Sequence, residues 1–255
     1  MPVALTLDLE QRGGLRVHRA TSLAPLGVDV IVTDRFGGVS KGPYESLNLA
    51  LHVGDDPRDV FENRRRVAHA LDVEADHLVF VDQVHGERVV DAHVKQPAEQ
   101  ADGVFSQRPD LALAILVADC VPVLLVDEDS SAFAVVHAGW RGLRGEVLKN
   151  ALDRFEDPHT VHALVGPSIS ATRYQVGPEV ADFFRDLPGA VHADHGDRSL
   201  LDLRRVAALL LVGYGLRDEN VRVCRESTDD AHVFYSARAQ QPCGRFALVA
   251  RRSVA

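Results

Sequence analysis

The feature that most constrains the fold is a series of short apolar runs of strand length, rich in valine, leucine and alanine. The runs between Leu111 and Val136 follow one another through turns too short to hold a crossover helix, so some neighbouring strands must pair antiparallel. Strands and helices alternate only in part elsewhere, so we expect a mixed sheet rather than a doubly wound parallel one. The strand-like runs are Val28–Thr33, Leu78–Val81, Leu111–Val117, Val121–Val126, Ala132–Val136, Val161–Val165 and Val221–Val223.

Four segments carry the start and stop signals of helices. They are Pro57 to about Leu71 with Asp55 or Asp56 as cap, Gly145–Phe155, Pro178 to about Leu187, and a segment capped by Asp202 that presents Val206, Leu209 and Leu210 before Gly213 and Gly215 end it.

Length and composition bound the class of protein. Without a repeat or a Pro/Gly/Ser-rich linker, residues 1–255 are expected to form one domain. The formal net charge of -9 gives no broad basic surface, so nucleic acid is not an expected partner. No apolar run approaches the roughly 20 residues that span a bilayer, so no membrane association is expected. Three cysteines without a close pair are typical of a reducing compartment, and we expect a cytoplasmic protein.

Three of the apolar runs lead into a residue that binds soft or borderline metals, namely His85, Cys120 and His137. Zinc accepts imidazole and thiolate ligands in a tetrahedral shell, and three protein ligands leave the fourth position for water or substrate. The sequence therefore predicts a catalytic zinc site on these residues. The ion would lower the pKa of a bound water towards about 7 or polarise a substrate oxygen.

The turn after Val126 sets how two of these ligands meet. If Glu128 and Asp129 are its central residues, Cys120 lies directly opposite His137. Opposed residues have Cβ atoms about 4.5 to 5.5 Å apart, close enough to share one ion, whereas a longer turn would shift the register.

Zinc is favoured over copper at this site. A copper centre with two His and one Cys usually adds a weak axial methionine, and the only methionine is Met1. We expect Asp119 or Asp127 to orient a ligand imidazole by hydrogen bonding.

Each ligand has an ordinary structural interpretation when taken alone. A lone buried cysteine is usually a core residue, and a single histidine at a strand end usually makes a structural hydrogen bond. The metal site is inferred from the coincidence of three such residues, each beside Gly or Asp. Other histidines gain no such support and are expected on the surface or in loops: His52, His159, His162, His192 and His195.

The segment Thr33–Ser40 is a candidate for anion or sugar recognition, together with Ser46–Asn48 and Asn63-Arg64. Its glycines permit close backbone approach, so backbone amides and Arg35 could cradle a phosphate or a ribose. The same glycines equally form a plain hairpin turn, and Arg64 is equally a solvated helix residue.

A second glycine-rich segment, His137–Gly142, lies between a strand and a helix. It places Arg141 where an anion would meet a helix N-terminus. Trp140 beside it is equally a core residue.

Taken together, these segments resemble a known family, the YfiH-type laccase-domain proteins, also called the polyphenol oxidase family and now regarded as purine nucleoside phosphorylases. The resemblance runs over nearly the whole chain. It rests on Arg35–Ser40, Ser46–Leu49, His52–Asp55, Asn63-Arg64, Gln83–Gly86, Ala101–Gly103, Ala118–Pro122, His137–Gly142 and Gly166–Ile169.

The resemblance implies an α+β fold: a single domain with mixed β-sheets packed together and flanked by helices. It also implies zinc on the three residues named above, no organic cofactor, and Arg35, Asn48 and Arg64 as contacts to nucleoside or phosphate. Family members carry out phosphorolysis of adenosine, inosine, guanosine and methylthioadenosine, and deaminate adenosine. A bacterial branch is linked to editing of peptidoglycan precursors.

The chain departs from the family pattern at two places. Where the family often has a pair of cysteines before Tyr-x-Val, residues 170–176 read SATRYQV, so those cysteines are not essential here. Near the C-terminus, Arg238 is followed by Ala239 instead of a second arginine, and Cys243-Gly244-Arg245 replaces the usual Thr-Gly-Arg.

Two other functions fit the same residues. One is a cysteine hydrolase, with Cys120 as nucleophile and His137 or His85 as base, acting on an amide bond of a cell-wall precursor. The other is a zinc-stabilised binding protein without turnover. For the phosphorylase, we expect purine nucleoside and phosphate as partners and a monomer or homodimer.

Overall fold

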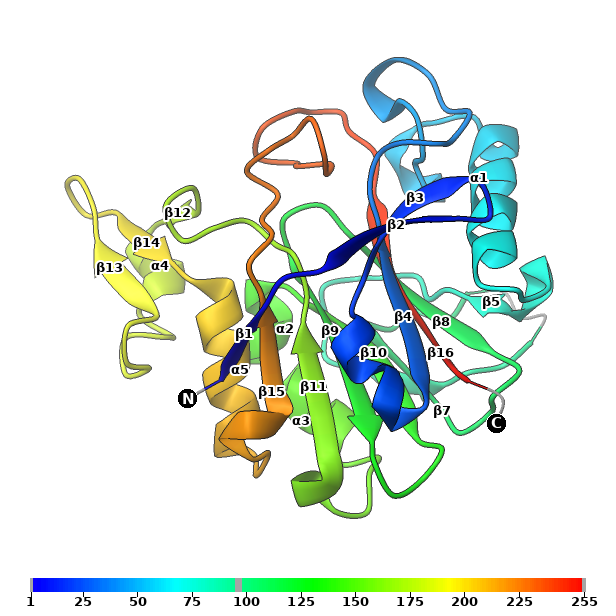
Figure 1. Cartoon of the computed structure of the whole chain (residues 1–255). Coiled ribbons are helices and arrows are strands. Elements are labelled where there is room, and N and C mark those ends of the chain that lie inside the picture. Colours follow the sequence, from blue (N-terminus) through cyan, green and yellow to red (C-terminus); the bar gives the residue numbers. More distant parts are fainter. Residues whose placement is uncertain (1, 95–97, 254–255) are drawn as a thin grey trace.

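The computed structural model describes residues 2–94 and 98–253 (Figure 1). Within these ranges, seven strands form a mixed sheet in which β9 pairs antiparallel with both of its neighbours, and β1, β15 and β11 run parallel. In order across the sheet, the strands are β1 (Val3–Leu5), β15 (Val221–Cys224), β11 (Val161–Val165), β9 (Val121–Asp127), β10 (Phe133–Ala138), β7 (Gly103–Ser106) and β6 (Val89–Asp91).

A second mixed sheet, of six strands in the described part of the chain, is antiparallel except where β5 pairs parallel with β8. In order, its strands are β2 (Asp8–Arg12), β3 (Leu15–Arg19), β4 (Val28–Thr33), β16 (Phe246–Arg252), β8 (Ala112–Val117) and β5 (Leu78–Val79).

The two large sheets pack face to face. Successive side chains on a strand point to opposite faces, so the central strands β8, β9 and β10, buried on both faces, are apolar except for Asp127 and His137. Leu124 of β9 and Phe133 of β10 share one apolar core with Ile115 of β8 and Leu248 of β16. This core lies between the sheets.

Helices cover the outer faces of both sheets (Figure 1). α1 (Pro57–Ala70) packs on the six-stranded sheet through a core that includes Val67 and Ile31. The Asp56 side chain caps α1, and Pro57 occupies its first turn. The outer face of the seven-stranded sheet is covered by α2 (Trp140–Arg144), α3 (Val147–Leu152) and α5 (Leu203–Gly213).

A small sheet stands at the left edge of Figure 1 beside α4 (Pro178–Ala181). Its strands are β12 (Gln175–Val176), β14 (Ser199–Leu201) and β13 (Val191–Ala193). Short 3-10 helices complete the described elements: η1 (Thr21–Leu26), η2 (Gly42–Tyr44), η3 (Leu51–Val53), η4 (Ala75–His77), η5 (Pro158–Thr160) and η6 (Asp218–Asn220).

The predicted α+β class, with mixed sheets packed together and helices outside, is confirmed. Two predicted helices differ in detail. The predicted helix Gly145–Phe155 is wrong at both ends: Glu146 takes a left-handed φ of 65° that separates α2 from α3, and α3 ends at Leu152. The third helix ends at Ala181 and not near Leu187. The extent of the domain, residues 1–255, stays a prediction.

The predicted register of β9 and β10 is wrong by two residues. Residues 128–132 form a longer turn than expected, so His137 pairs with Pro122 and not with Cys120. A shift of two keeps side chains on the same face, so Cys120 and His137 still point the same way.

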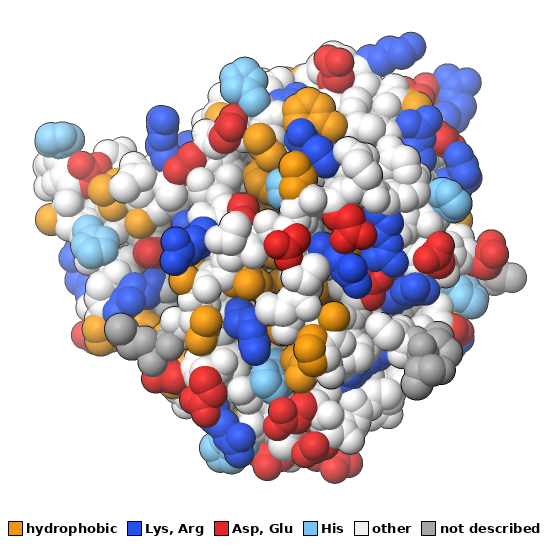
Figure 2. All heavy atoms as spheres, viewed as in Figure 1, with side chains coloured by type: hydrophobic (Ala, Val, Ile, Leu, Met, Phe, Trp, Pro, Cys, Tyr) orange, Lys and Arg blue, Asp and Glu red, His pale blue; other side chains and the backbone are white. Residues whose placement is uncertain are grey.

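No helix among the described residues is long and apolar enough to cross a membrane. On the face shown in Figure 2, acidic and basic side chains are intermixed.

Candidate metal centre and its cavity

Two of the three predicted ligands lie where the chain passes from one large sheet to the other. Cys120 lies between β8 of the six-stranded sheet and β9 of the seven-stranded sheet, and His85 lies between β5 and β6, which also belong to different sheets. His137 is near the end of β10, on the same face as Phe133 in the core between the sheets. The three side chains therefore meet at one end of the sandwich.

The structure brings His85, Cys120 and His137 together into a cluster able to hold a metal ion. Their ligand atoms all lie within 4.8 Å of one another, and the two imidazole rings are 4.8 Å apart, edge to face. A tetrahedral zinc shell sets nitrogen and sulfur donors roughly 3.5 Å apart, so small side-chain rotations suffice. In residues 2–94 and 98–253, no fourth His, Cys, Asp or Glu joins the cluster.

One buried carboxylate, Asp102, organises both histidines. Its Oδ1 accepts hydrogen bonds from His137 Nδ1 at 2.7 Å and from the His85 backbone N–H at 3.0 Å. Its Oδ2 accepts from the N–H groups of Val84 and Gly86. These bonds hold the turn in which His85 takes a left-handed φ of 61°, and they leave Nε2 of His137 for a metal.

The prediction that Asp119 or Asp127 orients a ligand imidazole is wrong. The Asp119 carboxylate instead accepts from Thr228 Oγ1 and from the backbone N–H of Arg238. Asp127 accepts from Ser130 and Thr160 at the far end of β9.

The electrostatics of the cluster favour a thiolate. Burial by itself raises the pKa of the Cys120 thiol, but the charge and hydrogen bonds of His137 and the hydrogen bond of His85 lower it to about 6. Burial by itself lowers the pKa of His137, but Cys120 and Asp102 raise it to about 9. Thiolate is the form of cysteine that binds metals and attacks electrophiles, so the donor set suits zinc.

Gly139 leaves space for the cluster. A Cβ atom at this position would lie 3.1 Å from Cys120 Sγ and 3.5 Å from Cδ2 of His85. The first glycine of the His137–Gly142 segment is thus explained by close approach to the sulfur.

The three candidate ligands line a cavity of about 530 Å³. Its polar lining includes His52, Gln83, Tyr174, Arg238 and Arg245. Gln83 is held in place by two hydrogen bonds to the backbone of Leu116, at the end of β8.

Of the four predicted substrate contacts, none lines this cavity. The guanidinium of Arg35 donates to the carbonyls of Glu45 and Ala231 and lies over the Tyr235 ring. Asn48 is buried, and its Oδ1 accepts from the backbone N–H of Arg245.

The other two predicted contacts lie close by. Arg64 donates to the Leu49 carbonyl, lies 3.8 Å from the centroid of the Phe80 ring, and lines a neighbouring cavity of about 340 Å³. Arg141 is exposed and lies over Trp140. The assignment of these four residues as substrate contacts stays a prediction.

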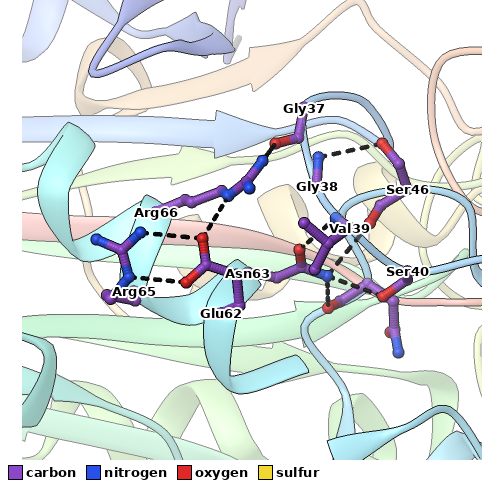
Figure 3. A network of polar contacts seen from close by, with 10 residues as sticks. Gly37, Gly38, Val39, Ser40, Ser46, Glu62, Asn63, Arg65 and Arg66 are labelled. Carbon is purple, nitrogen blue, oxygen red and sulfur yellow. Dashed lines mark hydrogen bonds and ion pairs between the residues drawn. The ribbon is translucent and has the colours of Figure 1, made fainter. Parts of the chain in front are cut away.

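The glycine-rich segment Thr33–Ser40 is fastened to α1, as Figure 3 shows. The Asn63 side chain accepts from Val39 N–H and donates to the Ser40 hydroxyl and the Ser46 carbonyl, while Arg66 donates to the Gly37 carbonyl. The role of Asn63 is therefore structural: its side chain holds the glycine-rich segment against α1.

Sequence reasoning missed several residues of the site. His52, expected on the surface without a role, is exposed but lines the cavity. His162, expected on the surface or in a loop, is buried in β11. Tyr174 and Arg238 carried no periodic or metal-binding signal. Asp102 stood in a noted segment, Ala101–Gly103, but nothing in sequence spacing pairs it with His137.

Comparison with known proteins places this geometry in a family. Residues 29–253 match the family model described as multi-copper polyphenol oxidoreductase laccase. A purine nucleoside phosphorylase of Pseudomonas aeruginosa is 38% identical over 234 residues, covering 88% of this chain and 93% of the relative. The purine nucleoside phosphorylase YfiH of Escherichia coli is 35% identical over 228 residues, with the same coverage of both chains.

Solved structures agree with the sequence relatives. The YlmD protein of Geobacillus stearothermophilus superposes with a TM-score of 0.89 at 28% identity, covering 97% of this chain and 99% of that one. A Neisseria meningitidis protein superposes with a TM-score of 0.84 at 33% identity, covering 89% and 95%. The chain therefore belongs to the laccase-like YfiH family, as its sequence motifs predicted.

Proposed function

We propose that the protein is a zinc-dependent purine nucleoside phosphorylase acting on adenosine, inosine, guanosine and methylthioadenosine. An oxygen of phosphate forms a bond to C1′ of the ribose while the bond from C1′ to N9 of the purine breaks. The bonding electrons leave with the base, which takes up the proton that the phosphate loses. The products are free base and ribose 1-phosphate, or 5-methylthioribose 1-phosphate where the substrate is methylthioadenosine.

The observation that carries the proposal is the cluster of His85, Cys120 and His137 lining a cavity of about 530 Å³. A cavity of this size suits a small organic ligand. Relatives that share more than a third of their residues with this chain are named purine nucleoside phosphorylases. Zinc bound to these three residues would supply a Lewis acid beside the substrate.

The chain's own residues mainly bind and orient. Asp102 holds the His137 imidazole and the backbone N–H of His85, and the polar lining of the cavity positions the two substrates against each other while positive charge develops on the ribose. Arg35, Asn48, Arg64 and Arg141 enter the proposal as residues that support the cavity wall or contact substrate at its rim.

We propose zinc, although the family model's description names copper. Two imidazoles and one thiolate suit zinc directly, whereas a copper centre with this donor set usually adds an axial methionine. No methionine occurs in the described ranges, because the only one is Met1. Metal analysis of purified protein by mass spectrometry tests this choice.

The central experiment incubates zinc-loaded protein with adenosine and phosphate, with and without a chelator. We expect adenine and ribose 1-phosphate in equal amounts, lost on chelation and in Cys120→Ala. Inosine and ammonia would instead report deamination of adenosine by water, which we propose as a second activity of the same cavity. Absence of every product from protein carrying stoichiometric zinc would favour a zinc-stabilised binding protein and refute the proposal.

One observation favours a second candidate, a cysteine hydrolase acting on an amide of a peptidoglycan precursor. Asp102 accepts a hydrogen bond from His137, and His137 in turn hydrogen-bonds Cys120, which is the arrangement of an orienting acid, a base and a nucleophile. An active metal-free enzyme that an alkylating agent inactivates at Cys120 would establish this alternative.

We further propose that the protein acts in the cytoplasm on small molecules, as a monomer or homodimer. Its three cysteines are free, which suits a reducing compartment. Gel filtration with light scattering measures the oligomeric state.

A further inference from the structure

One side of the cavity carries the guanidinium of Arg245 and the imidazole of His52, and neither group has a carboxylate partner of its own among the residues that the structure describes. Arg245 and His52 both line it, and neither forms an ion pair with an acidic residue in the described part of the chain. The lining contains one carboxylate, Asp119, and both of its oxygens already accept hydrogen bonds. This side of the cavity could therefore bind an anionic ligand.

Arg245 is rigidly held. Its backbone N–H donates to Asn48 Oδ1, and its carbonyl accepts from the Leu49 N–H. Its Nη1 donates to the carbonyls of Cys243 and Gly244 at 2.9 and 3.0 Å, while no hydrogen bond from Nε or Nη2 is formed within the described ranges. A guanidinium anchored by one nitrogen keeps its other donors free for a bidentate partner.

Arg64 supports this part of the cavity wall by binding the other side of the Leu49 residue. Its Nε donates to the Leu49 carbonyl at 2.9 Å, so Leu49 lies between Arg245 and Arg64. His52 follows three residues later. Partial burial lowers the pKa of His52, and the nearby charges of Arg245 and Arg64 lower it further against the opposing effect of Asp82. A neutral imidazole can still donate one hydrogen bond to an anion that Arg245 binds.

Arg238 is placed differently. Its guanidinium lies 5.1 Å from the centroid of the Tyr174 ring and donates to the Gln175 carbonyl. It is therefore associated with an aromatic wall, which suits a planar purine better than an anion.

We propose that Arg245 and His52 form the phosphate subsite of this cavity, with Arg64 supporting it through the Leu49 peptide. The inference rests on the proposed phosphorylase function and deepens it. Phosphate bound here would be held by charge-assisted hydrogen bonds from the Arg245 fork and by the His52 imidazole. His52 and Arg245 would thus fix the nucleophile, and the remaining lining would receive the nucleoside.

The test titrates zinc-loaded protein with inorganic phosphate by calorimetry, without nucleoside. We expect Arg245→Gln to weaken phosphate binding roughly tenfold to a hundredfold, as loss of a charged hydrogen-bonding group does. The matched control is Arg144→Gln, which removes an exposed guanidinium stacked on Phe183 and outside the cavity lining. Zinc content and melting temperature are measured for every variant.

His52→Gln keeps the test decisive if Arg245→Gln does not fold, because His52 is exposed. We expect it to weaken phosphate binding roughly twofold to tenfold. Wild-type protein that binds no phosphate, or folded variants that bind it as tightly as Arg144→Gln, would overturn the subsite.

Kinetics separate this inference from the function on which it rests. If phosphorolysis is observed, Arg245→Gln should raise KM for phosphate by the same factor and leave KM for the nucleoside within about twofold of the wild-type value. Phosphate binding that depends on Arg245 in a protein without phosphorolysis would refute the function and keep the subsite.

Discussion

Replacing Asp102 by asparagine tests whether one carboxylate organises the metal centre. Each carboxylate oxygen accepts two hydrogen bonds: Oδ1 from His85 N–H and His137 Nδ1, and Oδ2 from Val84 N–H and Gly86 N–H. In Asp102→Asn, an amide NH2 must replace one of the oxygens. Whichever way the amide turns, its NH2 then faces two N–H groups that had donated to the carboxylate oxygen it replaces.

The cost follows from the number of bonds lost. Two hydrogen bonds to a charged acceptor contribute about 1.5 to 3 kcal/mol each, so we expect a loss of about 3 to 6 kcal/mol in the free energy of unfolding. At about 2 to 4 °C per kcal/mol, the melting temperature should fall by roughly 6 to 24 °C.

The effect on metal binding has a separate cause. With Asp102 as acceptor, His137 carries its proton on Nδ1 and offers Nε2 to the metal. The amide NH2 is expected to face His137, because this imidazole can become an acceptor whereas the N–H groups of Val84 and Gly86 cannot. Facing Nδ1, the NH2 favours the other tautomer, which withdraws the Nε2 lone pair. We expect zinc affinity to fall roughly tenfold to a hundredfold.

Competition for zinc against a chelating dye measures the affinity, and calorimetry of the metal-free protein measures the stability. Asp127→Asn is the matched control, because Asp127 is also buried and accepts from Ser130 and Thr160 but contacts no imidazole. It should lose stability and keep zinc affinity. An Asp102→Asn protein that binds zinc as tightly as this control would refute the role assigned to Asp102.

Three further predictions concern the cluster and its scaffold. Gly139→Ala should weaken zinc binding about tenfold with little change in the stability of the metal-free protein, because the added Cβ meets Cys120 Sγ at 3.1 Å; equal zinc affinity would contradict this reading. In metal-free protein, alkylation of Cys120 should increase with pH around a midpoint of about 6, since His137 and His85 stabilise its thiolate. A rate that still climbs at about pH 8.5, like an ordinary thiol, would disprove the perturbation. Arg252→Ala should lower the free energy of unfolding by about 3 to 5 kcal/mol, because this buried guanidinium donates to five backbone carbonyls, including those of Asp127 and Ala132; thermal unfolding checks it, and a loss under about 1 kcal/mol would contradict it.

The ligand cluster was predictable because residues at the ends of buried strands lie at the edges of the sheets. His137 and Cys120 stand at the ends of continuous apolar runs, and strand ends meet at the edges of a sandwich. The register that pairs the two strands was not predictable, since it depends on the length of the turn at residues 128–132. The error of two residues preserved the face, which is why the cluster survived a wrong register.

The supporting residues lacked any such local signal. Asp102 bonds to a histidine 35 residues away, and Arg245 is held by Asn48, 197 residues away. Those pairings follow from which strands become neighbours, and β16 joins β4 and β8 only in the folded sheet. The N-terminal strands β2 and β3 are short and partly polar, so the apolar pattern did not reveal them.

Two non-glycine residues in left-handed backbone conformations flank the cluster, His85 at φ 61° and Asp119 at φ 91°. Such conformations are costly and persist only where the surroundings hold them. Here Asp102 binds the three amides around His85, and the Asp119 carboxylate is fixed by Thr228 and the Arg238 N–H. These hydrogen bonds of the scaffold therefore help to hold the donors close together. It follows that zinc should add stability by mass action to a protein already folded, so the melting temperature should rise with zinc concentration while the secondary structure stays unchanged.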